Sequence, residues 1–234
     1  MKKIRFNVIT FPGSNCDHDS YWIPTVRGNE AEFVWHKDNS LKSPDVVFIP
    51  GGFSYGDYLR CGAIAKFSPI MQEVKRFADK GGLVIGVCNG FQILTESGLL
   101  PGALMMNKHL DFICKHQHLS VESINSPFTN LYQHKQILDI PIAHKEGNYY
   151  IDNDGLKSLQ DNDQILFRYC DEKGNINADS NPNGAIDNIA GIVNINRNVL
   201  GMMPHPERAS EDVVNSQDGQ TLFASIEKWI RERL

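Results

Sequence analysis

Three short apolar runs, each followed at once by a glycine-rich or polar turn, constrain the fold of this sequence more than any other feature. The runs are IRFNVIT (4–10), DVVFIP (45–50) and LVIGVC (83–88), and they precede FPGSN, GGFSYGD and NGFQIL. Short, mostly apolar runs of this length, each ended by a turn, are typical of strands that are buried in a parallel sheet. The sequence therefore predicts an α/β fold, with a mostly parallel central sheet flanked by helices.

The remaining segments fill in this fold as one domain spanning residues 1–234. Segment 68–81 has helical spacing, with Ser68 as the expected N-cap, Pro69 in the first turn and Gly81 as the stop. Strand-like pieces after about residue 110 indicate additional antiparallel strands in the C-terminal half, and residues 218–234 predict a closing amphipathic helix. We expect the asparagine-rich stretch 171–188 to be a solvated surface loop.

Composition excludes several classes of protein. The chain of 234 residues has no run of about 18 apolar residues, which argues against a membrane protein, and its start resembles a first strand rather than a cleaved signal. A net charge of -5 without a basic cluster argues against nucleic-acid binding. The five cysteines are odd in number and lack zinc-ligand spacing, so we expect free thiols and a cytoplasmic protein.

Cys88 lies where the third apolar run ends, with Gly86 and Gly90 on either side. The pattern G-x-C-x-G is typical of a nucleophile elbow, a sharp strand-to-helix turn whose small neighbours let the backbone come close. A helix that begins near Asn89 favours a thiolate at its amino end. We therefore expect Cys88 to be an exposed, activated nucleophile. The alternative is a buried cysteine that packs as a small hydrophobic side chain.

Two other cysteines also follow turns. Cys16 lies in PGSNCD and Cys61 in LRCGA, so both could be close to the same site without reacting.

The stretch GMMPHPER supplies a general acid and base for a cysteine nucleophile, together with an acceptor to orient it. Pro206 biases His205 towards an extended backbone, in which residues two apart point the same way. His205 and Glu207 are therefore expected to project to one side, where the carboxylate could hold the imidazole in its working tautomer. For the oxyanion we expect the main-chain amides of Gly52, Phe53 and Asn89, since the Gly51-Gly52 pair can turn an amide towards a ligand.

These residues carry a family resemblance. Cys88 in GVCNGFQIL, the MMPHPER segment and the block IPGGFSYGDYLRCGAIA together resemble the class I, or triad, glutamine amidotransferases. With PGSNCD, GLLPGA and AHKEGN added, the matching blocks run from residue 8 to about 209. Within the class, they resemble the stand-alone glutaminase subunits of bacterial phosphoribosylformylglycinamidine synthase.

The resemblance implies a flavodoxin-like amidotransferase domain that hydrolyses L-glutamine to glutamate and ammonia through a γ-glutamyl thioester on Cys88. A separate synthase subunit would use ATP and the ammonia to convert formylglycinamide ribonucleotide to formylglycinamidine ribonucleotide, a step of purine biosynthesis. A third, small subunit would bridge the two. ATP and magnesium would belong to the synthase subunit, and we expect no cofactor and no metal on this chain.

The family pattern also assigns substrate contacts. It implies that Gln92 contacts the substrate glutamine, and that Asn107 and Phe112 lie where its α-amino and α-carboxylate groups are held. Lys145, in AHKEGN, departs from the glycine that is common in relatives, which puts the detailed geometry of that loop in question. His144 is an alternative general base, but it lacks the proline-bounded setting of His205.

Two other functions remain open at the level of sequence. A non-catalytic, flavodoxin-like binding module would have no use for a Cys88, His205 and Glu207 set. Another cysteine hydrolase of the same sheet type would usually take its acidic partner from elsewhere in the chain. Because a freely active glutaminase would waste glutamine, we also expect the site to be completed by docking, through the loops FSYGDYLRCG and AHKEGN.

Overall fold

One nine-stranded sheet runs through the computed structural model, which describes residues 2–57, 60–214 and 216–233. The strand order is β2-β1-β3-β4-β11-β10-β9-β6-β7. The first five strands are parallel: β2 (Glu30–Trp35), β1 (Arg5–Thr10), β3 (Val46–Ile49), β4 (Leu83–Val87) and β11 (Val199–Met202). The other four are antiparallel: β10 (Ile189–Val193), β9 (Ile165–Tyr169), β6 (Ile113–Val121) and β7 (Ile137–His144). The predicted α/β class, with antiparallel strands in the C-terminal half, is confirmed.

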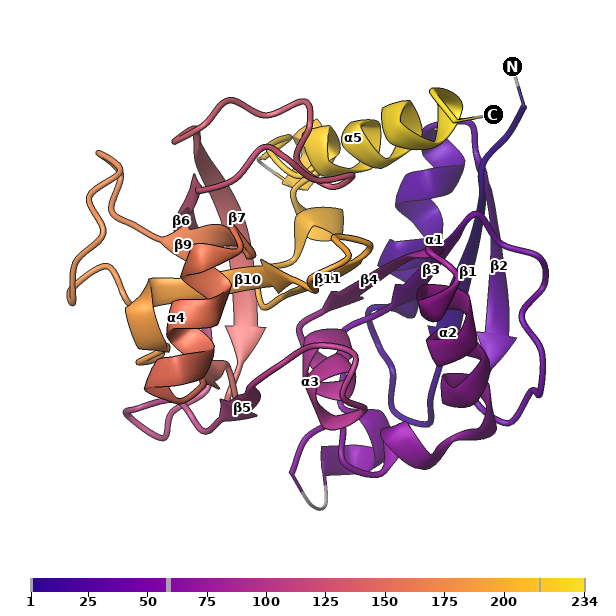
Figure 1. Ribbon diagram of the computed structural model, residues 1–234, viewed down its shortest axis with the longest axis horizontal. Helices are drawn as coiled ribbons and strands as arrows, with labels where there is room; N and C mark the ends of the chain where they lie inside the picture. The colour runs from indigo at the N-terminus through magenta and orange to yellow at the C-terminus, as the bar shows by residue number, and fades with distance from the viewer. Residues whose placement is uncertain (1, 58–59, 215, 234) are drawn as a thin grey trace.

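Helices and short turns complete the fold around this sheet. The helices are α1 (Asp17–Val26), α2 (Pro69–Asp79), α3 (Asn89–Glu96), α4 (Asn153–Asp161) and α5 (Gln220–Arg231). The 3-10 turns are η1 (Ser54–Asp57), η2 (Ala65–Phe67), η3 (Ile186–Asn188), η4 (Pro206–Arg208) and η5 (Asp212–Val214), and β5 (Ala103–Met105) pairs with β8 (Asn148–Tyr150). Figure 1 shows the parallel half on the right, the antiparallel half on the left and α5 across the top. That residues 1–234 form a single domain stays a prediction.

The central strands form where the sequence is most apolar. Every residue of β3 and β4 is buried, as uninterrupted apolar runs require. Helix α2 begins at Pro69 and ends before Gly81, which has φ +86°. Its buried residues are Ile70, Met71, Val74 and Ala78. The helix thus covers the sheet with one face, as its spacing predicted.

The asparagine-rich stretch 171–188 differs from the expectation of a solvated loop. Asn183 is fully buried, and its amide donates to the carbonyl of Gly147 at 2.8 Å and to the hydroxyl of Tyr169 at 3.2 Å. Asn188 is also buried and donates to the carbonyl of Tyr169 at 3.1 Å. These amides bond to main-chain carbonyl groups and to a tyrosine hydroxyl, so part of the stretch belongs to the interior rather than to the surface.

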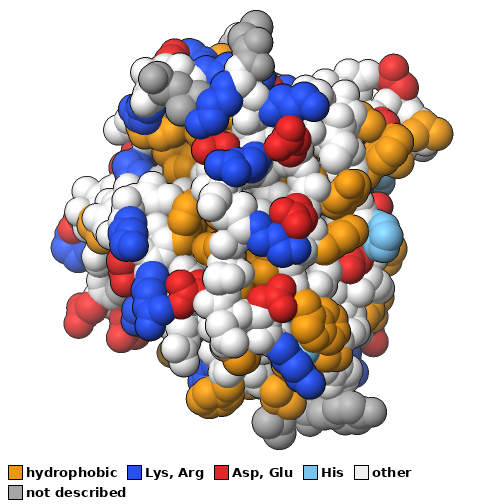
Figure 2. All heavy atoms as spheres, turned by 90° about the vertical axis from the view of Figure 1, so that its right-hand side faces the viewer, with side chains coloured by type: hydrophobic (Ala, Val, Ile, Leu, Met, Phe, Trp, Pro, Cys, Tyr) orange, Lys and Arg blue, Asp and Glu red, His pale blue; other side chains and the backbone are white. Residues whose placement is uncertain are grey.

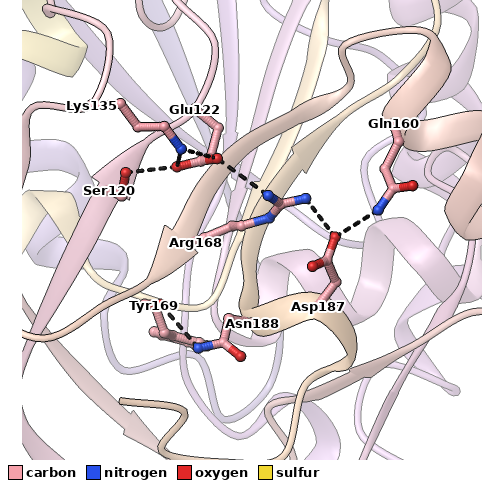
Figure 3. A network of polar contacts seen from close by, with 8 residues as sticks. All are labelled: Ser120, Glu122, Lys135, Gln160, Arg168, Tyr169, Asp187 and Asn188. Carbon is pink, nitrogen blue, oxygen red and sulfur yellow. Dashed lines mark hydrogen bonds and ion pairs between the residues drawn. The ribbon is translucent and has the colours of Figure 1, made fainter. Parts of the chain in front are cut away.

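A second brace joins the antiparallel strands to the elements beside them (Figure 3). Arg168 on β9 contacts Glu122 at 3.3 Å and Asp187 at 2.5 Å, and Lys135 contacts Glu122 at 2.7 Å. Gln160 on α4 donates to the same carboxylate of Asp187 at 2.9 Å. Four segments distant in sequence are therefore tied together around one guanidinium group.

The outer surface carries charges of both signs. On the face shown in Figure 2, acidic and basic side chains are interspersed with hydrophobic ones, and no patch of a single sign dominates. Among the described residues, no helix has the length and apolar character needed to cross a membrane.

Candidate active site

Cys88 lies between the end of β4 and the start of α3, in a strained backbone conformation with φ 52° and ψ -108°. Glycine is required two residues before and two residues after Cys88, because the main chain at Gly86 and Gly90 lies very close to other main-chain atoms. A Cβ on Gly90 would lie 2.0 Å from the carbonyl oxygen of Ile49, and one on Gly86 would lie 2.7 Å from the carbonyl oxygen of Gly90. Strain of this kind costs about 1–3 kcal/mol and persists only where the surroundings enforce it. The predicted elbow is present.

The thiol of Cys88 is less accessible than the sequence indicated. Only 6% of the residue is exposed, because α3 and β7 pack around it. The thiol donates to the carbonyl oxygen of Ala143 at 3.6 Å, and the main-chain amide of Cys88 donates to Met202 at 2.8 Å. The expectation of an exposed nucleophile is therefore wrong. Cys88 is buried, and it contributes to the wall of a pocket.

His205 and Glu207 form a buried pair beside Cys88. The Nδ1 atom of His205 lies 2.6 Å from Oε1 of Glu207, and the two residues are 1% and 3% exposed. The expected contact is present, but its backbone differs from the expectation. Pro206 opens the 3-10 turn η4 instead of continuing an extended segment. The tight turn, rather than strand geometry, brings the two side chains together.

The charges around His205 favour its protonated form. Burial alone disfavours the imidazolium, but the carboxylate of Glu207 and the charge of Cys88 hold the pKa of His205 well above its usual value. The Nε2 atom of His205 is buried and has no hydrogen-bond partner among the described residues. An imidazole so held can carry a proton to and from a bound substrate.

Cys16 is a second sulfur at the same imidazole. A Cβ on Gly51 would lie 2.8 Å from Cε1 of His205, 3.1 Å from Sγ of Cys16 and 3.3 Å from Cβ of Cys88, so all three surround one glycine. Arg208 donates to the Cys16 sulfur at 3.2 Å. Burial, opposed in part by His205, raises the pKa of Cys16 and keeps it a neutral thiol. The turn after β1 was the sequence signal for this proximity.

A metal ion is the other use that this cluster suggests. Cys16, His205 and Glu207 bring ligand atoms within 4.8 Å of one another, which is the one such group among the described residues. The direct hydrogen bond between His205 and Glu207 already occupies the carboxylate, so the arrangement fits proton transfer better than chelation.

A pocket of about 330 Å³ opens above the Cys88 thiol. It is lined by Gly52, Phe53, Asp57, Cys61, Cys88, Gln92, Met106, Phe112, Ala143, His144, Lys145 and Glu146. Its volume is typical of sites for small molecules. Several residues of the sequence prediction thus converge here, and the lining as a whole comes from four segments of the chain, 52–61, 88–92, 106–112 and 143–146.

The expected oxyanion hole is only partly as predicted. The amide of Phe53 donates to the carbonyl oxygen of Gly13 at 3.0 Å, so it is not available to an oxyanion, and the Phe53 ring instead forms the rim of the pocket. The amides of Gly52 and Asn89 have no hydrogen-bond partner among the described residues. The side chain of Asn89 accepts from the amide of Ser54 at 3.3 Å and so holds the Gly52 turn against α3.

Of the three residues expected to contact the substrate, Gln92 and Phe112 line the pocket and Asn107 does not. Gln92 lines the pocket, but its amide donates to the carbonyl of Glu146 at 2.6 Å and accepts from Asn89 at 2.8 Å. Phe112 lines the pocket and stacks on Phe53, with 6.5 Å between ring centroids. The structure does not bring Asn107 into the pocket lining. Its side chain is buried and bonds to the main chain of residues 111, 144 and 147.

His144 lines the pocket, but its ring is engaged in contacts with other residues. Its Nδ1 atom lies 3.2 Å from Oδ1 of Asn107, and its ring packs over Gly147. Burial, together with the charge of His205, lowers the pKa of His144 to about 3. A neutral imidazole engaged with Asn107 supports the preference for His205 as the general base.

Comparison with known proteins gives consistent matches over the whole chain. The family model of the CobB/CobQ-like glutamine amidotransferase domain matches residues 3–231. Phosphoribosylformylglycinamidine synthase subunit PurQ of Koribacter versatilis is 55% identical over 224 residues, which are 95% of this chain and 97% of the relative. The same subunit of Salinibacter ruber is 54% identical, over 95% of each chain. A chain in the structure of PurLQS from Thermotoga maritima superposes with a TM-score of 0.87 at 41% identity, covering 98% of this chain and all of that one.

Proposed function

Because the chain belongs to the family of CobB/CobQ-like glutamine amidotransferase domains, we propose that it is the glutaminase subunit of a phosphoribosylformylglycinamidine synthase. It hydrolyses L-glutamine to glutamate and ammonia, and the ammonia serves the conversion of formylglycinamide ribonucleotide to formylglycinamidine ribonucleotide in purine biosynthesis. The observation that carries this proposal is Cys88 on its elbow, with the buried His205 and Glu207 pair beside it.

The reaction follows from the placement of these groups. The Cys88 thiolate attacks the side-chain amide carbon of glutamine, and the amides of Gly52 and Asn89 stabilise the oxyanion, at about 3 kcal/mol for each donor. His205, held as imidazolium by Glu207, gives a proton to the leaving ammonia. The neutral His205 then takes a proton from the water that attacks the thioester. This releases glutamate and restores the Cys88 thiolate and the His205 imidazolium.

The chain acts in an assembly. One solved relative is a PurLQS structure, and the corresponding partners here are an ATP-using synthase subunit and a small bridging subunit. ATP and magnesium act on the synthase subunit, and this chain itself needs no cofactor. We place it in the cytoplasm, which agrees with the five free thiols of the chain.

Docking is expected to complete the site. The two candidate loops, FSYGDYLRCG (53–62) and AHKEGN (143–148), both contribute pocket residues, although residues 58–59 of the first lie outside the described residues. A hydrogen bond joins the loops, since the main-chain amide of Cys61 donates to the side-chain carboxylate of Glu146 at 3.2 Å. A partner that presses on either loop would therefore move both walls of the pocket.

Glutamate release from glutamine tests the proposal, measured for the chain alone and for the chain assembled with its synthase and small subunits. We expect release that rises on assembly and disappears in Cys88→Ala. The matched control is Cys114→Ala, which removes an exposed thiol on β6 and should keep full activity. Assembled wild-type protein without release that depends on Cys88 would contradict the proposed function, and equal release with and without partners would contradict the docking hypothesis alone.

A further inference from the structure

Two carboxylates lie on the wall of the pocket that contains the Cys88 thiol. Asp57 ends the turn η1, and Glu146 follows β7, and both line the pocket. They flank a common neighbour, because the main-chain amide of Cys61 donates to Oε2 of Glu146 at 3.2 Å, while its thiol interacts with Asp57. The mechanism described above uses neither carboxylate.

The charge of these carboxylates is not balanced within the pocket. Oδ1 of Asp57 is buried and has no hydrogen-bond partner among the described residues. Burial, together with the nearby charge of Glu146, raises the pKa of Asp57. Arg60 pairs with Glu96 at 2.5 Å and its charge also acts on Glu146, but neither Arg60 nor exposed Lys145 forms an ion pair with Asp57 or Glu146 in the described part of the chain. A buried acceptor without a donor is costly, so the site favours a cationic ligand.

The loop that carries Asp57 is held in a demanding conformation. Tyr55, Gly56 and Asp57 are three consecutive residues with positive φ, at 56°, 69° and 52°. The hydroxyl of Tyr55 anchors the loop against His36, 2.7 Å away, and against Ser68, 3.0 Å away. Left-handed residues other than glycine are rare and are concentrated at functional sites. The anchor fixes where the Asp57 carboxylate stands.

The substrate supplies the missing cation. L-glutamine carries an ammonium group at its α-carbon, at the opposite end from the amide that Cys88 attacks. The cavity of about 330 Å³ reaches both the thiol and the two carboxylates. Gln92 connects the thiol end of the cavity to its carboxylate end. It lies on α3, the helix that follows Cys88, and its side-chain amide donates to the main-chain carbonyl of Glu146 at 2.6 Å. An ammonium has three donors, enough to bond both carboxylates at once.

We infer that Asp57 and Glu146 together bind the α-ammonium group of glutamine and thereby select an amino acid over a simple amide. The inference rests on the proposed glutaminase function and assigns to these carboxylates the amino-group contact expected of Asn107, which is buried in other bonds. Asp57 and Glu146 are specificity-determining residues, whereas the bond-breaking groups stay those beside Cys88.

Hydrolysis of two amides by the assembled complex tests this assignment. One is L-glutamine, and the other is glutaramate (4-carbamoylbutanoate), which has the same amide and carboxylate but no amino group. For Asp57→Asn and Glu146→Gln we expect kcat/KM for glutamine to fall by about 10- to 100-fold, mainly through KM. Hydrolysis of glutaramate should be unchanged. Asparagine tolerates positive φ, so the first variant keeps the loop conformation.

Glu172→Gln, which removes the same charge from an exposed position, serves as the matched control and should leave both substrates unaffected. An equal fall for glutamine and glutaramate in either variant, or no fall for glutamine, overturns the inference. If Asp57→Asn fails to assemble, the test rests on Glu146→Gln, through the ratio of its kcat/KM for glutamine to its kcat/KM for glutaramate. Wild-type complex that does not release glutamate at all contradicts the proposed function instead, so the two failures are distinguishable.

Discussion

The catalytic proposal depends at the residue scale on one short hydrogen bond. Glu207 is almost fully buried, and its Oε1 atom lies 2.6 Å from Nδ1 of His205. The carboxylate does two things there: it selects the tautomer that leaves Nε2 facing the thiols, and it stabilises the imidazolium. The elbow places the nucleophile, but this pair determines whether a proton is available for the leaving ammonia.

Replacing the carboxylate by an amide is expected to disable this pair. In Glu207→Gln the imidazolium loses its negative partner, so kcat for glutamine hydrolysis by the complex should fall by about 10²- to 10⁴-fold. Steady-state kinetics with saturating glutamine would measure this. Glu232→Gln, an exposed change of the same kind after α5, is the control and should retain wild-type kcat. A wild-type kcat in Glu207→Gln would exclude the assigned role.

His144 is expected to make stability depend on pH. Its pKa is lowered from 6.5 to about 3, so between these values the unfolded chain binds a proton that the native chain does not. Its contribution is therefore complete above pH 6.5 and is lost as pH falls, by about 1.4 kcal/mol for each pH unit. Urea unfolding at pH 7.5 and 5.5 should show a smaller pH effect in His144→Gln than in wild type.

Exposed His109→Gln is the control for this comparison and should keep the wild-type pH effect. Equal pH effects in wild type and His144→Gln would show that His144 is not held neutral by the fold.

Some residues of the site could be predicted from the sequence, and others could not. Cys88 was predictable because two glycines mark the elbow, and the spacing of His205 and Glu207 marked a pair. The engaged amide of Phe53 was not predictable, because its acceptor, the carbonyl of Gly13, is distant in sequence. Asn107 shows the same limit, since burial and not residue type decided whether its side chain could reach a ligand.

At the scale of elements, the contact of α3 with β3 positions the nucleophile. Glycine is required at position 90 because the helix backbone touches the carbonyl of Ile49. Alanine usually stabilises a helix by about 1 kcal/mol relative to glycine. In Gly90→Ala that gain is reversed, since the new methyl group would lie 2.0 Å from a main-chain oxygen.

We therefore expect Gly90→Ala to lower the melting temperature by several degrees or to prevent folding. The control is Gly155→Ala in α4, where the nearest atoms belong to the side chains of Ile151 and Asp152 rather than to the main chain, so the change should be smaller. The test is the melting temperature of the wild-type protein, Gly90→Ala and Gly155→Ala, measured under the same conditions. Unaltered stability of Gly90→Ala would mean that α3 and β3 are not in contact as described.

Strands and helices were predictable where the pattern was strong. The apolar runs of β1, β3 and β4 predicted buried parallel strands, and the helical spacing of α2 and α5 predicted both helices. The prediction did not include β2 and α1, because β2 is a half-exposed edge strand with charged residues and α1 contains Pro24. The pairing that determines β2 is tertiary, because β2 lies in parallel register with β1.

For the whole molecule, the sheet explains why distant segments meet. Strands β1, β3, β4 and β11 are parallel, so the turns after them lie at one edge. Those turns carry Cys16, Gly51, Cys88 and His205. Ligand sites of open α/β sheets lie at this edge, next to a change in strand order. The antiparallel half adds the other wall, through Ala143 near the end of β7 and Glu146 after it. The site is thus a product of the complete sheet.

The measurement that tests the central claim most directly is the mass of the covalent intermediate. The assembled complex would be mixed with glutamine, quenched in acid, digested and examined by mass spectrometry. We predict one glutamyl group on the peptide that contains Cys88, and none in Cys88→Ala. Because Cys16 also contacts the His205 imidazole, it is the competing position. A glutamyl group on Cys16, or turnover without any glutamyl thioester, would contradict the account.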